Sequence, residues 1–303
     1  MALNRKTPET RGTFVFYSLL AGVFWGTSFP IVKWGLDFIS PVWFSALRLA
    51  LAFICLLPLV SQKHIFLHFP FRYWLLGFFN ALGFLLQFLG MQFTSASKAS
   101  FYVNTNLIFV AVFSFLFLHE RFGGRKIAGV ILAVAGIYLL SIGLNSPAVL
   151  FTGKLKGDLL VLSAGVSWSI FVILNKTVLH SPKYSVLDTV SLFMLTSAVL
   201  MILVAPFLEP FPVHLSGKGL VVLLVSSSLA LALPFYLWSL GLKGLTATVS
   251  SLLILVEIVV ATLLSIVFLN ERLDGAEMLG AAVLLVSMVL ASLPEKERPP
   301  SHA

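Results

Sequence analysis

Long apolar runs separated by short polar connections make up almost the whole chain. Ten runs are long enough for a helix to cross a hydrocarbon core about 30 Å thick, which takes roughly 20 residues. Backbone groups find no hydrogen-bonding partners in lipid, so each run is predicted to be helical. The sequence therefore predicts an all-α membrane protein with ten transmembrane helices at about 14–33, 42–60, 73–93, 99–118, 127–144, 158–179, 188–208, 218–240, 246–269 and 277–293.

The composition agrees with a bilayer as the solvent. Of the 303 residues, 59% are hydrophobic and 11% are charged, and the mean hydropathy is +1.02. A soluble domain carries roughly 25% charged residues. The net charge of +8 arises from Lys and Arg residues that stand singly or in small groups between apolar runs, which argues against nucleic acid as a partner.

The sequence offers no cofactor motif and no complete metal site. Cys55 is the only cysteine, so a thiolate cluster is excluded. His64 and His68 have the i, i+4 spacing of a metal-binding helix face, but no third ligand stands nearby. The chain also lacks the clustered nucleophile, acid and base that a membrane enzyme would need, so an enzyme is the less favoured alternative.

One stretch occurs twice, at a separation of 151 residues. Residues 96–129 align with residues 247–280, and nine of the 34 positions are identical. A shorter match earlier in the chain supports the repeat, because Ala21-Gly22-Val23-x-Trp25 recurs as Ala164-Gly165-Val166-x-Trp168. We therefore predict two five-helix repeats, at residues 14–144 and 158–293, with short tails at 1–13 and 294–303.

Positive charges predict the orientation of these repeats. With the N-terminus inside, 13 Lys and Arg residues fall on the cytoplasmic side, six fall outside, and Arg48 lies within a span. Both termini are then cytoplasmic in a cell inner (plasma) membrane. An odd number of spans per repeat inverts the second repeat relative to the first, and inverted repeats are the architecture of secondary transporters. A channel is less favoured, because repeat-related positions such as Asn106 and Glu257 differ chemically.

Several short motifs resemble one family. The first half contains Phe24-Trp25-Gly26-Thr27-Ser28-Phe29, Ala46-Leu47-Arg48, Thr94-Ser95-Ala96-Ser97-Lys98-Ala99 and Phe117-Leu118-His119-Glu120-Arg121. Their order, together with the repeat, resembles the EamA family of the drug/metabolite transporter superfamily over residues 16–293. The resemblance implies a ten-helix carrier with a central cavity between the halves, whose relatives move amino acids, drugs and other metabolites, usually outward.

The chain departs from that family at two positions. Family members often have proline where this chain has Leu107 in the fourth span and Ile258 in the ninth. Proline loosens a helix by removing a hydrogen bond. Its absence leaves open whether this chain bends at the two positions.

Glu257 is the carboxylate closest to the middle of a predicted span. Holding it charged there costs roughly 2.5–3.5 kcal/mol, so it should face a cavity or a partner. Desolvation favours its neutral form, which makes it either a proton carrier or a protonated acid bonded to a neighbouring helix. Its repeat mate is the uncharged Asn106.

Other polar and aromatic side chains within spans are expected to surround the substrate. Polar groups in lipid tend to face other helices, which makes Asn104 a further candidate. Trp238 stands near a helix end and fits an interfacial belt or helix packing better. The predicted substrate-binding set is Trp25, Gln87, Tyr102, Asn106, Trp168, Asn175, Tyr236 and Glu257.

Four charged residues are predicted to serve gating or structure. Arg48 either binds a substrate carboxylate or ties down helix ends, and we favour the structural role. Lys33 is either an interfacial anchor or part of the outer vestibule. Glu120 and Glu271, at opposite membrane faces, are each expected to cap or pair with the start of the next helix.

The sequence as a whole predicts a secondary active transporter that exports a small organic metabolite by alternating access. An amino acid or similar amphiphile is the preferred solute, and protons carried by Glu257 are a possible driving ion. Uptake and multidrug transport by the same fold are the alternatives. Gly129, Gly136 and Gly143 form a small-residue seam that either packs internally or supports a weak homodimer, and we favour internal packing.

Overall fold

The fold is described by a computed structural model that covers residues 10–60, 63–118, 123–142, 153–179, 181, 183–211, 216–245 and 247–292. Within these residues every regular element is helical, which confirms the predicted all-α class. The α-helices are α1 Arg11–Gly35, α2 Pro41–Leu56, α3 Arg72–Met91, α4 Ala96–Asn104, α5 Asn106–Leu118, α6 Gly124–Ile142, α7 Gly153–Leu179, α8 Val186–Leu208, α9 Gly217–Ser227, α10 Leu233–Gly244, α11 Ala247–Ile254, α12 Val256–Leu269 and α13 Gly275–Ser292. Two 3₁₀ turns, η1 (Leu57–Leu59) and η2 (Lys63–Phe66), follow α2, and the π-helical turn η4 (Ser228–Ala232) joins α9 to α10.

Within the described residues, each of the ten predicted spans falls on helical segments, and seven helices are long and apolar enough to cross a membrane. The apolar parts of α6 and α13 are shorter, at Ile127–Leu140 and Gly275–Leu290. The predicted fourth, eighth and ninth spans are each interrupted. They consist of α4 with α5, α9 with η4 and α10, and α11 with α12.

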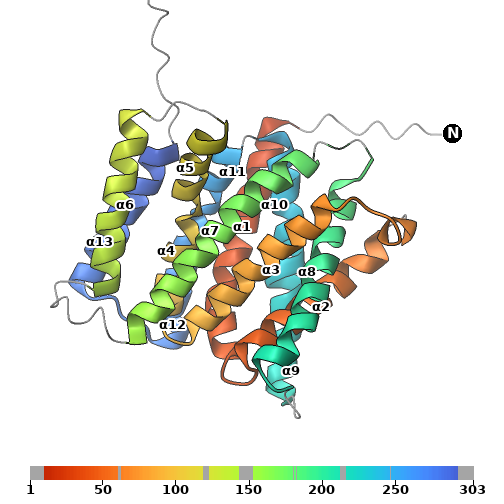
Figure 1. Cartoon of the computed structure of the whole chain (residues 1–303). Helices are drawn as coiled ribbons and strands as arrows, with labels where there is room; N and C mark the ends of the chain where they lie inside the picture. The colour runs from red at the N-terminus through yellow and green to blue at the C-terminus, as the bar shows by residue number, and fades with distance from the viewer. Residues whose placement is uncertain are drawn as a thin grey trace, which may run out of the picture.

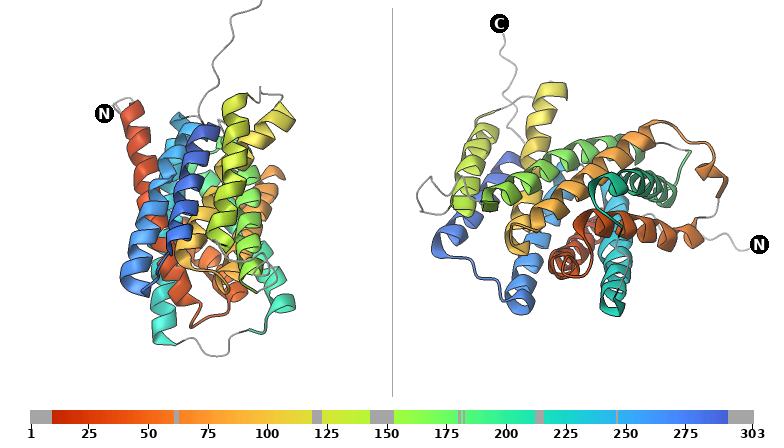
Figure 2. Two further views of the ribbon diagram at one scale, coloured as in Figure 1. Left: turned by 90° about the vertical axis from the view of Figure 1, so that its left-hand side faces the viewer. Right: turned by 60° about the horizontal axis from the view of Figure 1, so that its bottom comes forward.

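The helices run roughly side by side between two ends of the bundle (Figure 1). The upper end, as drawn, holds the starts of α1, α6 and α11, and the lower end holds the starts of α4, α7, α9 and α13. The principal packing partners are α6 with α13, α7 with α3, α1 with α10 and α12, and α8 with α2 and α3. Figure 2 shows α6 and α13 as a pair at one side of the molecule.

Two glycines let intact helices approach the interrupted ones closely. A Cβ atom on Gly22 of α1 would lie 2.6 Å from Val256 Cγ1 and 3.2 Å from the Ile254 carbonyl oxygen. A Cβ atom on Gly165 of α7 would lie 3.0 Å from Thr105 Oγ1. These distances are too short for most side chains, so both positions favour glycine. The approach places α1 against the α11/α12 break and α7 against the α4/α5 break.

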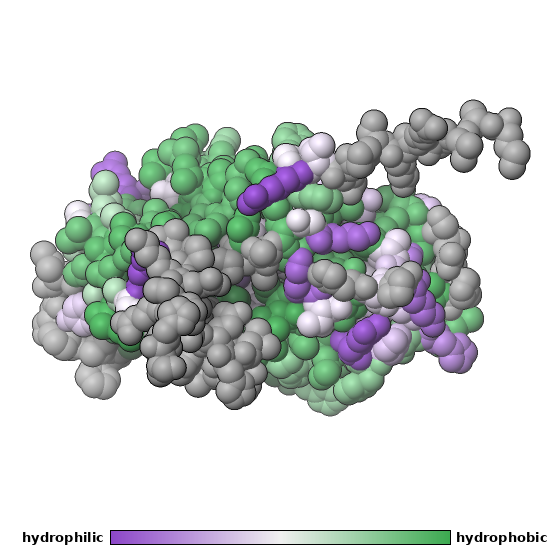
Figure 3. All heavy atoms as spheres, turned by 90° about the horizontal axis from the view of Figure 1, so that it is seen from above, coloured by the Kyte–Doolittle hydropathy of each residue, from purple (hydrophilic) through white to green (hydrophobic). Residues whose placement is uncertain are grey.

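The outer surface of the bundle is apolar. Large side chains such as Phe207, Ile131 and Phe268 are more than half exposed, as suits a surface that faces lipid. Seen end-on in Figure 3, hydrophobic side chains surround the rim, whereas hydrophilic side chains gather on the end that faces the viewer. This distribution is that of a multi-pass membrane protein.

Part of the predicted glycine seam packs inside the molecule. Gly136 lies against the backbone of Gly280 and Leu284 on α13, and Gly280 lies against Leu140 on α6. Gly143 falls outside the described residues. Close approach of α6 and α13 therefore uses small residues from both helices.

Candidate functional site

A pocket lies among the interrupted spans and the helices that pack on them. Counted with the open space at its mouth, the pocket has a volume of about 660 Å³. It is lined by α1, α3, α4, α5, α7, α10, α11 and α12, through Trp25, Ser28, Phe29, Phe84, Gln87, Val103, Asn104, Asn106, Trp168, Phe171, Val172, Phe235, Trp238, Ser251, Ile254 and Glu257.

The pocket is bordered by two helix breaks that form without proline. At the first, Thr105 N–H donates to the Tyr102 carbonyl and Ile108 N–H donates to the Thr105 carbonyl, both in the tight 3₁₀ pattern. At the second, Leu255 and Ile258 make equivalent bonds to residues three positions earlier. Both spans are therefore interrupted although the family's prolines are absent.

Glu257 lies in the first turn of α12, beside the second break. Its side chain is 5% exposed and lines the pocket. Asn104 Nδ2 donates to Glu257 Oε1 at 3.4 Å and to the Ser100 carbonyl at 2.9 Å, which joins the two breaks across the pocket. Asn106, the repeat mate of Glu257, lines the same pocket.

Aromatic rings form much of the remaining wall. Trp25 meets Phe235 edge-on with ring centroids 4.9 Å apart, and Phe84 meets Trp168 in the same way at 5.1 Å. Trp238 packs against Trp25 and Phe235, is 2% exposed and lines the pocket. Of the two alternatives expected for Trp238, these contacts agree with helix packing and not with an interfacial belt.

Five of the eight predicted substrate-binding residues line the pocket: Trp25, Gln87, Asn106, Trp168 and Glu257. The other three do not. Tyr102 donates its hydroxyl to Asp158 instead, Asn175 is fully buried elsewhere, and Tyr236 is half-buried on α10. Sequence reasoning did not single out Phe84, Phe171 or Phe235, since a chain with 28 Phe residues gives no signal to separate lining rings from lipid-facing ones.

Arg48 stands immediately behind the pocket wall. It is 1% exposed, and its Nε donates to the Ser226 carbonyl at 3.2 Å. Its Nη2 donates to Ser28 Oγ at 2.7 Å and to the Ala230 carbonyl at 2.9 Å. Arg48 thus supplies hydrogen bonds to two backbone carbonyls at and just before the π-helical turn η4. This agrees with the structural role that we favoured for Arg48.

Two lysines make matching contacts at opposite ends of the bundle. Lys33 Nζ donates to the carbonyls of Met91 and Thr94, after the end of α3. Lys176 Nζ donates to the carbonyls of Leu242 and Leu245, at the end of α10, both at 2.6 Å. Lys33 is therefore tied to protein carbonyls, and sequence reasoning missed the equivalent role of Lys176.

Glu271 caps a helix, but not the one expected. Its carboxylate accepts hydrogen bonds from the backbone N–H groups of Ala96 and Ser97, at 2.7 and 3.0 Å, and from the Ser97 hydroxyl at 2.7 Å. The capped helix is α4 in the first half, whereas the sequence pointed to the following helix, α13. A contact across 175 residues gives no local pattern to read. Glu120 lies outside the described residues.

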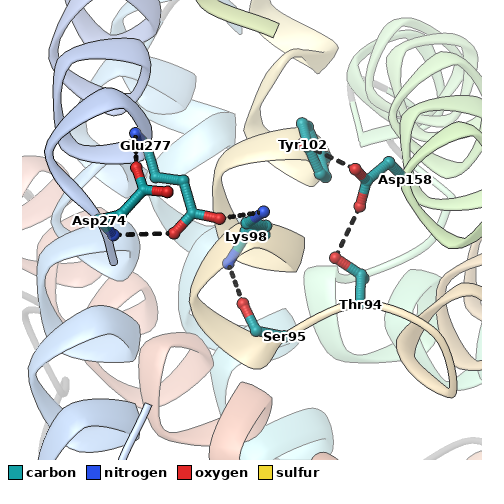
Figure 4. Close-up of polar contacts among 7 residues, drawn as sticks. All are labelled: Thr94, Ser95, Lys98, Tyr102, Asp158, Asp274 and Glu277. Carbon is teal, nitrogen blue, oxygen red and sulfur yellow. Dashed lines mark hydrogen bonds and ion pairs between the residues drawn. The ribbon is translucent and has the colours of Figure 1, made fainter. Parts of the chain in front are cut away.

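A polar cluster surrounds the start of α4 at the lower end (Figure 4). Lys98 Nζ lies 2.5 Å from Glu277 Oε1 on α13. Asp158 of α7 accepts hydrogen bonds from Thr94 Oγ1 at 2.7 Å and from the Tyr102 hydroxyl at 3.2 Å. These contacts, which we call the α4 latch, join α4 to both α7 and α13.

An apolar helical bundle with an aromatic and polar pocket at its interrupted spans defines a membrane transporter. The chain belongs to the EamA-like transporter family, whose model matches residues 12–142 and again residues 155–293.

Two relatives and one solved structure illustrate the match. An uncharacterized transporter of Archaeoglobus fulgidus is 26% identical over 90% of this chain and 84% of its own length. A probable amino-acid metabolite efflux pump of Salmonella typhimurium is 27% identical over 91% of this chain and 93% of its own. A crystal structure with a TM-score of 0.68 and 18% identity, covering 93% of this chain and 98% of that one, shares the fold. These names indicate transporters rather than enzymes.

Proposed function

We propose that the protein is a secondary active transporter that exports a small organic metabolite, an amino acid or similar amphiphile, by alternating access around the central pocket. The name of the Salmonella relative supports outward movement of an amino-acid metabolite. We place the protein in the plasma membrane with both termini and the upper end cytoplasmic, following the distribution of Lys and Arg.

The observation that carries this proposal is the pairing of the pocket residues. Alternating access around a fixed site is expected where two inverted repeats meet. Shifts of 143 residues, as between Trp25 and Trp168, and of 151 residues relate fourteen of the sixteen lining residues in pairs. The pairs are Trp25/Trp168, Ser28/Phe171, Phe29/Val172, Phe84/Phe235, Gln87/Trp238, Val103/Ile254 and Asn106/Glu257.

Contacts outside the pocket obey the same shifts. The carbonyls bound by Lys33 are those of Met91 and Thr94, and the shift of 151 residues gives Leu242 and Leu245, which Lys176 binds. The shift of 143 residues relates Lys33 to Lys176, and it also relates Gly22 to Gly165, which approach the two breaks. These correspondences support repeats at 14–144 and 158–293 that form the two sides of one site.

The α4 latch supports a closed outer mouth in this state. The shift of 151 residues replaces Lys98 with Val249 and Glu277 with Lys126, so the same ion pair cannot form between α11 and α6 at the cytoplasmic end. An ion pair that joins the two repeats at the outer end without this counterpart biases the equilibrium between inward-facing and outward-facing states. Opening to the outside then requires release of α4 from α7 and α13.

Proton coupling through Glu257 completes the proposal. A carboxylate buried in the pocket is neutralised either by a proton or by a bound solute group. Movement of the proton inward down its gradient would then drive the solute outward.

The test is release of solutes from liposomes that contain the purified protein. The vesicles are loaded with labelled amino acids and other amphiphilic metabolites, and the external medium is made more acidic than the lumen. Faster release under the gradient, lost in Glu257→Gln, is the expected result. Asp37→Asn makes the same acid-to-amide change at an exposed position and should behave as the natural protein.

Two other results would change the proposal. Release that is equally fast in Glu257→Gln, with or without the gradient, would make the protein a uniporter and Glu257 a structural hydrogen-bonding group. Absence of release for every solute would contradict export of this class of metabolite.

A further inference from the structure

We propose that the pocket selects organic cations: the substrate carries a positively charged nitrogen that binds between Glu257 and the aromatic wall, beside a neutral hydrogen-bond acceptor and an apolar body. This inference rests on the proposed function, since it names the class of solute that the transporter would carry.

Charge is the first argument. Glu257 is the only ionisable side chain among the described residues that line the pocket. Its carboxylate accepts one hydrogen bond from the described chain, the long one from Asn104, although a carboxylate has about four acceptor positions. A buried carboxylate with so little support is stabilised by a counter-charge, and no protein cation lines the pocket to supply it.

The aromatic wall is the second argument. Trp25, Phe84, Trp168, Phe171, Phe235 and Trp238 line one pocket with the carboxylate. Their ring faces carry partial negative charge and attract a cation within about 6 Å, most strongly when water is excluded. A carboxylate among such rings is a site for an ammonium group.

The surroundings of Arg48 argue against an anionic substrate. Its guanidinium group is already bound to Ser28, Ser226 and Ala230, and Phe84 covers it with the ring centroid 5.5 Å from Cζ. A substrate carboxylate in the pocket would therefore meet neutral donors and the like charge of Glu257. The ammonium group of a zwitterion would be attracted to Glu257, but its carboxylate would be repelled, so a zwitterion would bind more weakly than a cation.

One indole N–H group specifies the neutral acceptor. Nε1 of Trp238 is buried and has no hydrogen-bond partner in the described part of the chain. The side chain of Trp238 lines the pocket. Unpaired buried donors are costly, so a carbonyl or ether oxygen of the substrate would be favoured there. The best ligand is thus an amphiphile with one cationic nitrogen and one uncharged acceptor.

A series of ligands on one scaffold tests the inference with the purified full chain in detergent. Phenylalaninamide is cationic with a neutral carbonyl, phenylalanine is zwitterionic, N-acetylphenylalanine is anionic, and N-acetylphenylalaninamide is neutral. Calorimetry gives each affinity, and tryptophan fluorescence gives an independent signal, since Trp25, Trp168 and Trp238 lie in the pocket. We expect phenylalaninamide to bind roughly ten-fold or more tightly than the other three.

Variants assign the selectivity to named groups. Glu257→Gln should reduce phenylalaninamide affinity by roughly ten-fold or more and leave N-acetylphenylalaninamide nearly unchanged. Glu257→Asp, which keeps the charge, should retain the preference for the cation. Trp25→Leu should weaken the cation more than the neutral compound, whereas Trp25→Phe keeps an aromatic face. The ratio between two ligands separates these effects from general damage to the fold.

The outcomes distinguish this inference from the proposed function. Equal or tighter binding of phenylalanine or N-acetylphenylalanine, or an unchanged preference in Glu257→Gln, would overturn cation selectivity. If phenylalanine is nevertheless released from liposomes, the proposal of export remains valid without cation selectivity. Glu257-dependent binding of phenylalaninamide would support the cation site even if no solute crosses the membrane, and in that case the transport proposal fails alone.

Discussion

Arg48 and Glu257 are buried charged side chains in or beside the pocket wall, and their surroundings separate their roles. Arg48 donates three hydrogen bonds and lies between the rings of Phe84 and Phe88. Glu257 accepts one hydrogen bond and borders the pocket. A buried charge that is held by three hydrogen bonds and two ring contacts stabilises the fold, whereas a charge with free acceptor positions is able to bind a ligand.

Arg48→Met should lower stability more than it lowers binding. The substitution leaves the carbonyls of Ser226 and Ala230 and the hydroxyl of Ser28 without this donor, which costs roughly 2–4 kcal/mol. The melting temperature in detergent should fall by about 5 °C or more, and Lys218→Met, at an exposed position, should melt as the natural protein does. An unchanged melting temperature with lost solute binding would instead assign Arg48 to the substrate.

The sequence identified the polar half of the pocket better than its apolar half. A charged or amide side chain within an apolar run is rare, so Gln87, Asn106 and Glu257 stood out. Phe84 and Phe235 did not, because phenylalanine is equally suited to lipid and to a pocket wall. Glu271 pointed to a helix cap, but only the folded chain shows that the cap belongs to α4.

The two helix breaks show that proline is not needed to interrupt these spans. Each break is a single residue, Thr105 or Leu255, whose N–H donates to a carbonyl three positions earlier. An intact helix packs on each break through a glycine. The breaks are therefore stabilised by tertiary contacts, and the local sequence does not predict them. This is why the sequence predicted two continuous helices there.

Restoring the family's proline at the second break should cost stability. Ile258 N–H donates to the Leu255 carbonyl at 3.1 Å, and proline has no N–H to make this bond. The Ile258 side chain is buried, so Ile258→Ala is the control that loses packing but keeps the N–H group. We expect Ile258→Pro to be less stable than Ile258→Ala by about 1 kcal/mol in chemical unfolding. Equal losses in the two variants would contradict the hydrogen-bonding pattern of this break.

Breaking the α4 latch should open the pocket to the outside. Lys98→Gln removes the ion pair with Glu277, so the outward-facing state should gain population. Cys55 is the only natural cysteine, and Cys55→Ala with Ser251→Cys places one thiol in the pocket wall. A membrane-impermeant maleimide added outside cells should label that thiol several-fold faster when Lys98→Gln is added.

A second charge change provides the control for the latch. Lys218→Gln removes a positive charge from an exposed position outside the latch and should leave the labelling rate unchanged. Slower labelling in Lys98→Gln would mean that the latch stabilises the outward-facing state instead.

The whole chain was easier to predict than its pocket. The length of the apolar runs follows from the thickness of the bilayer, which is the same for every span. The repeat is visible because identical residues survive at fixed spacing, as at Glu120/Glu271 and Gly129/Gly280. The pairs of helices that pack together depend on how side chains from distant segments fit. The sequence of a single span does not contain this information.

The opposite orientation of the two repeats is open to a direct measurement at one matched pair of positions. Gly124 begins α6 and Gly275 begins α13, at opposite ends of the bundle (Figure 1), and they are separated by the repeat shift of 151 residues. Both are exposed, and a Cβ atom at either would meet nothing within 4 Å. Cysteine is therefore tolerated equally at the two positions once Cys55→Ala has removed the natural thiol.

Inverted repeats predict labelling from opposite sides of the membrane. With both termini cytoplasmic, Gly275→Cys should react with an impermeant maleimide in intact cells, whereas Gly124→Cys should react only after the membrane is permeabilised. Reaction of both in intact cells, or of neither, would mean that the repeats are parallel. The reverse pattern would agree with inverted repeats but would place both termini outside. The α4 latch would then lie at the cytoplasmic end of the bundle.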